Sequence, residues 1–599
     1  MSSEWSPGSK PVKLFPSTPH GDAVVIPVNA FLTRVAPPLQ RTLDVAQVVR
    51  NLLRTNKRWP VIQNGRWRVF TQDPADSDQP RTKRYKRLES VVEAIHKAAG
   101  VAEVPVLLIQ RSQCVMGSED RDQHTLPDAY FSRGRCARDW TDVAAFGELH
   151  EKDSDADFEE NVRKVTESMH HCMKKDARRR FVYAFTINNA TIRLWFCDRS
   201  QILVTEPFKF ITDHHTLVHF FLSVMYASSS DLGLDSTMTL SEDGRHYDIK
   251  LCSSDHARTY RTLKLLSPLE FYLLSKATRV WKAVRVEEGK EVGPPVVLKD
   301  MWRYPHLESE GMILKNLLDD LYKDSGQANS FFVAIEEYGD VYLDEECTIL
   351  DCTSVFNPAD SIRPPPLTCR ADLLARGPRG RLARVHHRSM IKEVCKPLDT
   401  ETSLAKVFQH LSQITQTLRT LHLAGWVHRD ISPANILLKN DGTALLADLE
   451  YAKPMDTAPE QRTGTPGFIA LEVVIGKYRF PPRKDSLPPS GEHTLMEKVR
   501  ETKDGKPVFK DAPKAVPTYH SVDGEGLPDV RYNPLHDLES LWWVAVHFIA
   551  TQEIYNADGA ESEPFVASAA QRQYAAELFD DTGRRRPDRG APLRSGAHS

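Results

Sequence analysis

A short segment between Trp426 and Leu438 gathers side chains that could transfer a phosphoryl group. It contains His-Arg-Asp followed, five residues after the Asp, by Asn435. The Asp430 carboxylate could orient a hydroxyl group and accept its proton, and the Asn435 amide could ligate a metal ion bound to ATP. Apolar residues on both sides predict short buried strands that hold the segment as a loop. This spacing therefore indicates phosphate transfer from ATP to a hydroxyl.

Three further motifs follow this loop in the order found in protein kinases. An apolar run ends at Asp448, where the D-F-G motif of kinases places a magnesium-binding carboxylate. The sequence Ala470-Leu-Glu472 lies where A-P-E closes the kinase activation segment. Asp537 begins a predicted buried helix, like the helix that supports the catalytic loop of kinases. Four elements in this order resemble a protein kinase.

The same residues are similar to one family in particular, the fungal-specific protein kinases. Its hallmarks H-R-D-I-S-x-x-N-I-L, G-T-x-x-F-x-A-L-E and D-L-E-S-x-x-W-V all occur here. The resemblance covers roughly residues 140 to 550. It implies an α+β, bilobal protein-kinase-like fold with a small β-rich lobe and a larger helical lobe, an α/β N-terminal extension, and Ser/Thr kinase ancestry. Four upstream stretches look like the N-terminal part of the same family domain: Phe181-Val-Tyr-Ala-Phe185, Leu194-Trp-Phe-Cys-Asp-Arg-Ser200, Glu206-Pro-Phe208 and Leu232-Gly-Leu-Asp235.

The resemblance implies a role for each matching residue, with ATP and Mg²⁺ as cofactors. Lys299 ends an apolar stretch like V-A-I-K and would grip the α- and β-phosphates. Its ion-pair partner should lie on the next helix, where Glu310 precedes a helical apolar stripe and is favoured over Glu308. The other implied roles are catalytic base for Asp430, Mg²⁺ ligation by Asn435 and Asp448, a bridge to the activation segment by Arg429, and structural support by His428, Glu472 and Asp537.

The stretch expected to cover the phosphates departs from the family pattern. Where the family has G-x-G-T-R-V, this chain has Ser275 and Ala277 in place of both glycines. Glycine permits positive φ and close approach of the backbone to phosphate, so the loop is expected to grip ATP more weakly. Val280 is still expected to cover the adenine. The adenine-binding hinge is expected at Glu393, Val394 and Cys395.

These substitutions leave three functions open. The first is an active protein kinase, with Thr463 and Thr465 as substrate-platform or regulatory sites. The second is a pseudokinase scaffold, because the loop glycines are missing, Glu450 replaces the Gly of D-F-G, and the C-terminal part is short. The third is a small-molecule phosphotransferase of the aminoglycoside or choline kinase type, since those enzymes often carry D-x-E, as in Asp448-Leu-Glu450. Arg429 and the long activation segment favour protein substrates.

Composition is typical of an intracellular protein in the cytoplasm or nucleus. The net charge of −3 argues against nucleic acid or an anionic membrane as partner. Nine Cys without C-x-x-C pairs indicate reduced thiols. The N-terminus lacks the apolar core of a secretory signal, and the longest apolar run, Leu541 to Ala550, is too short to span a bilayer.

The chain divides into five predicted regions. Alternating apolar residues predict a β-hairpin from Phe181 to Phe196, and an apolar helix follows at Leu217 to Met225. Apolar residues at helical spacing predict a long buried helix from Val407 to Leu421. The regions are a partly disordered N-terminal appendage (1–140), an α/β part (141–260), the small lobe with an inserted loop near 325–385 (261–395), the large lobe with an insertion near 476–533 (396–555), and a polar tail (556–599).

Overall fold

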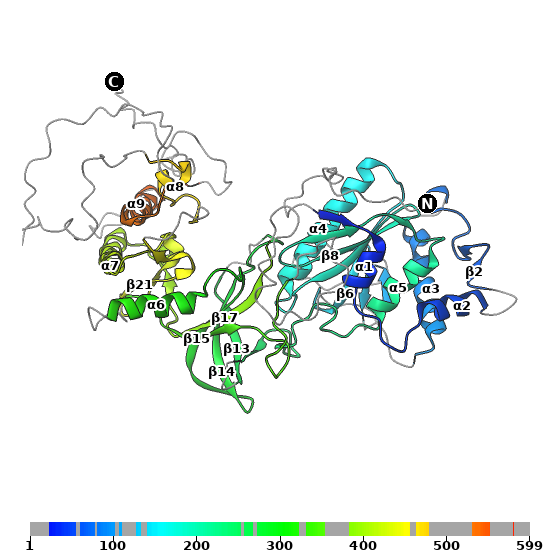
Figure 1. The fold of residues 1–599 in the computed structure, drawn as a ribbon, viewed down its shortest axis with the longest axis horizontal. Coiled ribbons are helices and arrows are strands. Elements are labelled where there is room, and N and C mark those ends of the chain that lie inside the picture. Colours follow the sequence, from blue (N-terminus) through cyan, green and yellow to red (C-terminus); the bar gives the residue numbers. More distant parts are fainter. Residues whose placement is uncertain are drawn as a thin grey trace, which may run out of the picture. The chain divides into compact units, whose positions relative to one another are not determined.

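The structure, a computed structural model, consists of two compact units (Figure 1). The first comprises Met1–Gly311 and Ala334–Val394, and the second comprises Met312–Val333 and Cys395–Ser599. The chain therefore passes between the units after Gly311, after Val333 and after Val394. The structure describes residues 23–54, 60–77, 81–101, 107–110, 127–132, 140–252, 257–267, 272–322, 331–353, 382–455, 463–478, 530–551 and 579.

The first unit begins with a mixed sheet of parallel and antiparallel strands. We call this sheet and the helices that pack on it the N-terminal domain (residues 23–235). Its strand order is β1-β9-β8-β7-β6-β5-β4, and β10 pairs with β8. β6 and β7 run parallel and are joined by helix α4, so they form a βαβ unit. The strands are β1 (Ala23–Ile26), β4 (Leu107–Gln110), β5 (Ala129–Ser132), β6 (Val143–His150), β7 (Val182–Asn188), β8 (Thr191–Cys197), β9 (Ile202–Thr205) and β10 (Phe208–Lys209), with a separate hairpin of β2 (Ile62–Gln63) and β3 (Arg66–Trp67).

Helices cover both faces of this sheet (Figure 1). Successive side chains of a strand point to opposite faces, so Tyr183 and Phe185 of β7 enter one apolar core while Val182 and Ala184 enter the other. The hairpin β7–β8 and the helix α5 confirm the two elements predicted from the sequence. The first core contains α1 (Val28–Arg34), α2 (Val45–Arg54), α3 (Arg81–Ala99) and α5 (His214–Met225), and the second contains α4 (Asp155–Lys175).

A second sheet completes the first unit, and every described strand pair in it is antiparallel. In its order β11-β12-β13-β14-β15-β17-β16, the long strand β15 lies between β14 and β17. Helix α6 (Glu310–Tyr322) begins shortly after β15 and continues into the second unit. The strands are β11 (Met238–Leu240), β12 (Tyr247–Cys252), β13 (Ala257–Leu265), β14 (Arg279–Glu287), β15 (Lys290–Arg303), β16 (Ile335–Asp340) and β17 (Val385–Ile391).

The second unit is built mainly on two long helices, α7 (Leu404–Leu423) and α9 (Pro534–Thr551), which pack against each other. Ser403 caps α7 by accepting a hydrogen bond from the Lys406 N–H. The predicted apolar stripe is confirmed, because Val407, Leu411, Ile414, Leu418 and Leu421 are all buried. The shorter elements are β18 (Lys396–Pro397), β19 (Trp426–Val427), β20 (Ile436–Leu438), β21 (Ala444–Leu446), β22 (Lys453–Pro454) and α8 (Leu471–Ile475).

Two features differ from the predicted regions. The N-terminal sheet continues across residue 140, because β5 pairs with β6 in a register that places Tyr130 opposite Phe146. The predicted insertion near 325–385 contains an edge strand, β16, which pairs with β17. Its mostly polar sequence did not predict a strand. Residues 325–330 and 354–381 of that insertion, residues 479–529 of the second insertion, and the tail other than Phe579 lie outside the described residues. Within the described chain, no helix combines the length and apolarity needed to cross a membrane.

Candidate active site

In the first unit, Lys299 and Glu310 form a buried ion pair. The Lys299 ammonium donates to Glu310 Oε2 at 2.9 Å, and the two side chains are 10% and 4% exposed. The strand β15 carries Lys299 and the first turn of α6 carries Glu310, so regular structure on both sides fixes the ammonium. The Glu308 side chain is exposed. Val280 lies directly opposite Lys299 in the β14–β15 register and shares its face of the sheet.

The loop before β14 retains a backbone shape that glycine usually supplies. Ala277 has φ 45°, in the left-handed region. An L-residue in this region costs about 1–2 kcal/mol. Local hydrogen bonds hold the turn: the Ala277 N–H donates to Ser275 Oγ at 3.2 Å, and the Lys276 carbonyl accepts from the Trp302 N–H at 2.8 Å. Ala277 therefore strains this loop while the turn itself is kept.

In the second unit, His428 holds the backbone of the loop that contains Asp430 between two strands. Its Nε2 lies 3.1 Å from the Ala447 carbonyl, and its Nδ1 lies 3.3 Å from the Asp430 N–H. A neutral imidazole satisfies both contacts when Nε2 carries the proton, because Nε2 then donates and Nδ1 accepts. The loop lies between β19 and β20, and β20 pairs with β21, so His428 ties the loop to the segment that leads to Asp448.

Asp537, in the first turn of α9, also holds this loop by hydrogen bonds to its backbone. Its two carboxylate oxygens accept the backbone N–H groups of His428 at 2.8 Å and Arg429 at 2.9 Å, and its Oδ2 also lies 3.0 Å from His422 Nε2. Burial alone would raise the pKa of Asp537, but these hydrogen bonds and the neighbouring imidazoles hold it below its usual value. Arg429 has φ 74°, so the carboxylate stabilises an unfavourable backbone conformation.

The Asp430 carboxylate faces the segment that precedes α8. Its Oδ1 accepts the Thr465 N–H at 2.8 Å and the Thr465 hydroxyl at 2.6 Å. Burial raises the pKa of Asp430 and the nearby Asp448 carboxylate raises it further, while the Thr465 hydrogen bonds oppose both effects. A partly buried carboxylate with a raised pKa is a better proton acceptor than an ordinary surface Asp.

Replacing Thr465 by Val should shift the pH dependence of any proton transfer to Asp430. Because the hydroxyl lowers the pKa of Asp430, its removal should raise that pKa. Asp430 would then be protonated at higher pH, so the rate at pH 6 should fall more than the rate at pH 8. The measurement is kcat/KM against pH. Thr465→Ser keeps the hydroxyl and should retain the wild-type profile, and an unshifted profile for Thr465→Val would contradict the assigned contact.

Asn435 and Asp448 form the donor set that fits a magnesium ion. Asn435 commits its amide N–H to the Asp430 carbonyl at 2.9 Å, which orients its amide oxygen as the atom able to ligate a cation. The Ala447 N–H donates to the backbone carbonyl of Asn435 at 3.0 Å. Asp448, the residue after Ala447, is therefore held beside Asn435. Asp448 has φ 62°. A carboxylate and an amide oxygen, supplemented by water and phosphate oxygens, match the preference of Mg²⁺.

Sequence reasoning did not identify Tyr532, which lies at the centre of the contacts around Arg429. The Arg429 guanidinium lies 4.6 Å from the Tyr532 ring centroid and donates to the Tyr451 carbonyl at 3.4 Å. The Tyr532 hydroxyl donates to the Thr463 carbonyl at 2.6 Å. Arg429 thus connects its loop with Tyr451 directly and with Thr463 through Tyr532. No local pattern marks Tyr532, because its partners are remote in sequence.

Glu472 is also held by a residue that the sequence did not single out. Its Oε2 lies 3.1 Å from His536 Nε2, and the neighbouring Glu539 accepts the Leu471 N–H at 2.9 Å. His536, Asp537 and Glu539 all lie in the first turns of α9. The first turns of α9 therefore support both the loop that contains Asp430 and the start of α8.

The predicted hinge occupies the point where the chain leaves the first unit. The Glu393 carboxylate accepts the Ala334 N–H at 2.9 Å, and the boundary falls between Val394 and Cys395. The predicted site residues are divided between the two units. Within the first unit lie Ser275, Ala277, Val280, Lys299, Glu310, Glu393 and Val394, and within the second lie Cys395, His428, Arg429, Asp430, Asn435, Asp448, Glu472 and Asp537.

Comparison with known proteins gives similarities to kinases. The sequence model of the fungal protein kinase family matches residues 127–549. Over 111 residues the chain is 34% identical to the serine/threonine-protein kinase PknA of Mycobacterium tuberculosis, covering 18% of this chain and 24% of that protein. Over 92 residues it is 35% identical to the dual serine/threonine and tyrosine protein kinase of Gallus gallus, covering 15% and 10%. Over 66 residues it is 36% identical to cGMP-dependent protein kinase 2 of Mus musculus, covering 11% and 9%. The chain therefore matches about a quarter or less of the length of these relatives.

Proposed function

The chain belongs to the fungal protein kinase family, and from that premise we propose that it transfers the γ-phosphate of ATP to Ser or Thr hydroxyls of proteins. The bilobal kinase fold, the ATP and Mg²⁺ requirement and the Ser/Thr preference are parts of this proposal. The partial matches to a serine/threonine kinase and to a dual-specificity kinase support kinase chemistry in general.

The observation that carries the proposal is the contact between Asp430 and Thr465. An aliphatic hydroxyl donates to Asp430 Oδ1 at 2.6 Å, so the carboxylate accepts the kind of group that a Ser or Thr substrate would offer. Burial raises the pKa of Asp430, which suits a general base. These features support an aliphatic hydroxyl as the phosphate acceptor.

In the proposed reaction, Asp430 accepts the substrate proton as the hydroxyl oxygen bonds to the γ-phosphorus. The bond from that phosphorus to the bridging oxygen breaks, and ADP leaves. Mg²⁺ held by Asn435 and Asp448 would neutralise charge on the phosphates. Lys299, oriented by Glu310, would hold the α- and β-phosphates. Val280, the loop with Ser275 and Ala277, and the backbone from Glu393 to Cys395 complete the proposed nucleotide contacts.

A non-catalytic scaffold is the second candidate, and the loop before β14 favours it. Ala277 holds a positive φ that glycine would adopt without strain, and the segment is tied to Trp302 by a backbone hydrogen bond. A loop with less freedom could accommodate phosphates poorly. The two candidates differ in whether ATP is turned over.

The test is phosphate transfer from labelled ATP and Mg²⁺ by the full-length protein. The acceptors are the protein itself and peptide libraries that contain Ser, Thr or Tyr as the only hydroxyl. Label on Ser or Thr that requires Mg²⁺ would support the proposal. ATP binding without turnover, in protein shown to be folded, would favour the scaffold. Phosphorylation of small alcohols with none of peptides would overturn both candidates.

A further inference from the structure

A buried network of charged side chains lies behind Lys299. Adjacent residues of a strand point to opposite faces, so Asp300 faces away from the ion pair of Lys299 with Glu310. Asp300 Oδ1 lies 2.8 Å from both His386 Nε2 and Arg388 Nε, two residues of the neighbouring strand β17. The strand that carries the proposed phosphate-binding ammonium is thus held from its other face.

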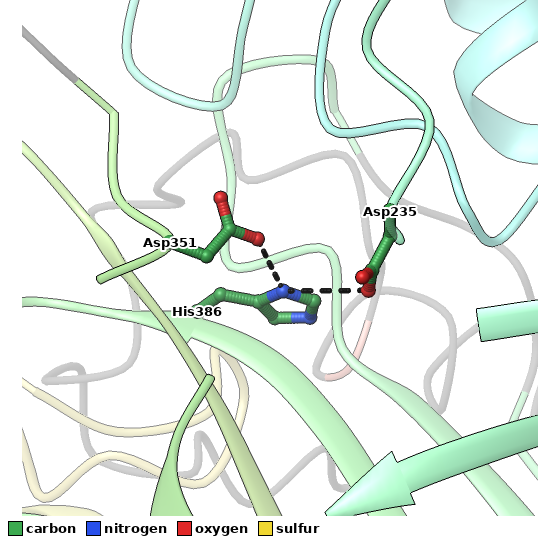
Figure 2. Close-up of side chains that lie close together, drawn as sticks. All are labelled: Asp235, Asp351 and His386. Carbon is green, nitrogen blue, oxygen red and sulfur yellow. Dashed lines mark hydrogen bonds and ion pairs between the residues drawn. The ribbon is translucent and has the colours of Figure 1, made fainter. Parts of the chain in front are cut away.

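The network continues into the N-terminal domain at two places. Arg388 donates to Asp235 Oδ2 at 2.6 Å, and Asp235 lies after α5 in that domain. His386 Nδ1 lies 2.8 Å from Asp351 Oδ2, and Arg180, which precedes β7, donates to Asp351 Oδ1 at 3.1 Å. Figure 2 shows the His386 ring with its Nδ1 directed toward Asp351 and Asp235.

The charges of this network balance without a metal ion. Ligand atoms of Asp235, Asp351 and His386 lie within 4.8 Å of one another, a spacing that a metal could span. However, Arg388 and Arg180 already neutralise the two carboxylates, and a protonated His386 neutralises Asp300. Burial alone would lower the pKa of His386, but the Asp300 and Asp351 carboxylates outweigh burial and raise it to about 9. A cation held beside two guanidinium groups would be repelled, so the geometry fits an ion network.

Alkaline pH should therefore loosen the first unit. The groups facing His386 are Asp300, Asp351, Asp235 and Arg388, with the Trp302 ring stacked at 4.6 Å. Because the folded-state pKa is raised, the stabilisation is complete below about pH 6.5 and is lost as pH rises through about 9. The thermal midpoint should fall between pH 7 and pH 10 by more in the wild type than in His386→Gln, which cannot titrate. Equal falls would contradict the charged state of His386.

Two further contacts attach the loop before β14, and the start of β14 itself, to the N-terminal domain. Leu273, in the loop before β14, is fully buried in the apolar core that α4 forms with the N-terminal sheet. Arg279, the first residue of β14, donates to the carbonyls of Met173 at 2.8 Å and Lys174 at 3.2 Å, at the C-terminal end of α4. A helix C-terminus favours a cation, so this contact is well placed. The loop and β15 are thus both attached to one domain.

We propose that the N-terminal domain is a positioning element of the nucleotide site, which holds β15 through the Asp300–His386–Arg388 network and the loop through Leu273 and Arg279. The inference rests on the proposed kinase function. A loop without glycines has less backbone freedom to adapt to phosphate, so its position depends more on what it is attached to. Weakening the attachment would lower the fraction of molecules whose loop and Lys299 are placed to bind ATP, and the apparent affinity would fall by the same factor.

The test changes the network on its N-terminal side, in the full-length chain. Asp235→Asn removes the charge that Arg388 contacts, and Thr237→Val removes the hydroxyl that accepts from Arg388 at 2.7 Å and donates to Asp235 Oδ1 at 2.6 Å. Asp248→Asn is the matched control, because it makes the same change in the partly exposed ion pair of Asp248 with Arg261 in the second sheet. The readouts are KM for ATP, kcat, the dissociation constant of ATP and the active fraction.

For Asp235→Asn we expect KM and the dissociation constant of ATP to rise about tenfold with kcat within about threefold of wild type, and a smaller rise in the same direction for Thr237→Val. Asp248→Asn should match the wild type. A purely structural role would lower the active fraction and leave KM unchanged, which would overturn the inference. It would also be overturned by a tightly bound metal that Asp235→Asn loses. If the wild type itself neither binds nor turns over ATP, both the proposed function and the positioning role are refuted. If the wild type binds ATP and the variants bind it equally well, only the positioning role is refuted.

Discussion

Asp430→Asn should lower phosphate transfer by about 10²- to 10⁴-fold, the contribution typical of a positioned general base. The amide has the same shape as the carboxylate, and its oxygen can still accept the N–H and hydroxyl of Thr465. The fold and ATP affinity should therefore persist while proton acceptance is lost. The measurement is the initial rate of transfer beside the dissociation constant of ATP.

The matched control for this substitution is Asp441→Asn. Asp441 lies in the turn between β20 and β21, where its carboxylate accepts the Thr443 N–H at 2.9 Å and is largely exposed. An Asn oxygen can make the same contact, so the rate should stay within about twofold of wild type. A rate for Asp430→Asn within tenfold of wild type would mean that another group accepts the proton, or that the chain does not use this site.

Asp537→Asn should destabilise the second unit by about 2–4 kcal/mol, because a charged acceptor of buried donors is replaced by an amide. Asp537 uses both oxygens, one for the Arg429 N–H and one for the His428 N–H and the His422 ring. An Asn offers a single oxygen, so in either orientation its NH₂ group must face the backbone N–H of Arg429 or of His428. The thermal midpoint of the full-length protein measures the effect.

The same substitution should also slow the reaction. The φ of 74° at Arg429 persists because Asp537 fixes its N–H, so a weaker acceptor should let the loop relax and displace Asp430. A displacement of about 1 Å can cost about 10²-fold in rate, and we expect kcat to fall by 10- to 100-fold. Glu539→Gln is the control, since its remaining oxygen can still accept the Leu471 N–H. Wild-type stability and rate in Asp537→Asn would show that the loop does not depend on this helix.

Local patterns predicted much of the second unit because their determinants are close together in sequence. Asp430 and Asn435 are five residues apart, and the Asn435 side chain bonds the Asp430 carbonyl within the same turn. The stripe from Val407 to Leu421 became the buried face of α7, since helical spacing alone aligns those residues. The family match from residue 127 to residue 549 agrees with the resemblance inferred from these motifs.

The first unit was harder to predict, because its elements are defined by remote pairing. The strand β16 has the polar sequence Ile335-Glu-Glu-Tyr-Gly-Asp340, which indicates a loop until β17 supplies its hydrogen-bond partner. The N-terminal appendage turned out to contribute β1, β4 and β5 to the same sheet as β6. Sheet edges accept strands from anywhere in the chain, and alternation within one strand does not name its neighbour.

The sequence by itself determined which candidate reactive groups this protein has and their order: Lys299, then the Asp430 carboxylate, then Asn435 and Asp448 as a candidate pair of metal ligands. Only the tertiary structure decided how buried charges are matched, as when Asp300 meets His386 and Arg388, and Arg388 meets Asp235. The physical reason is that a buried charge must be neutralised by whichever opposite charge folding brings within hydrogen-bond distance. His386 lies 86 residues from Asp300, and Arg388 lies 153 residues from Asp235, so no local spacing predicts either pairing.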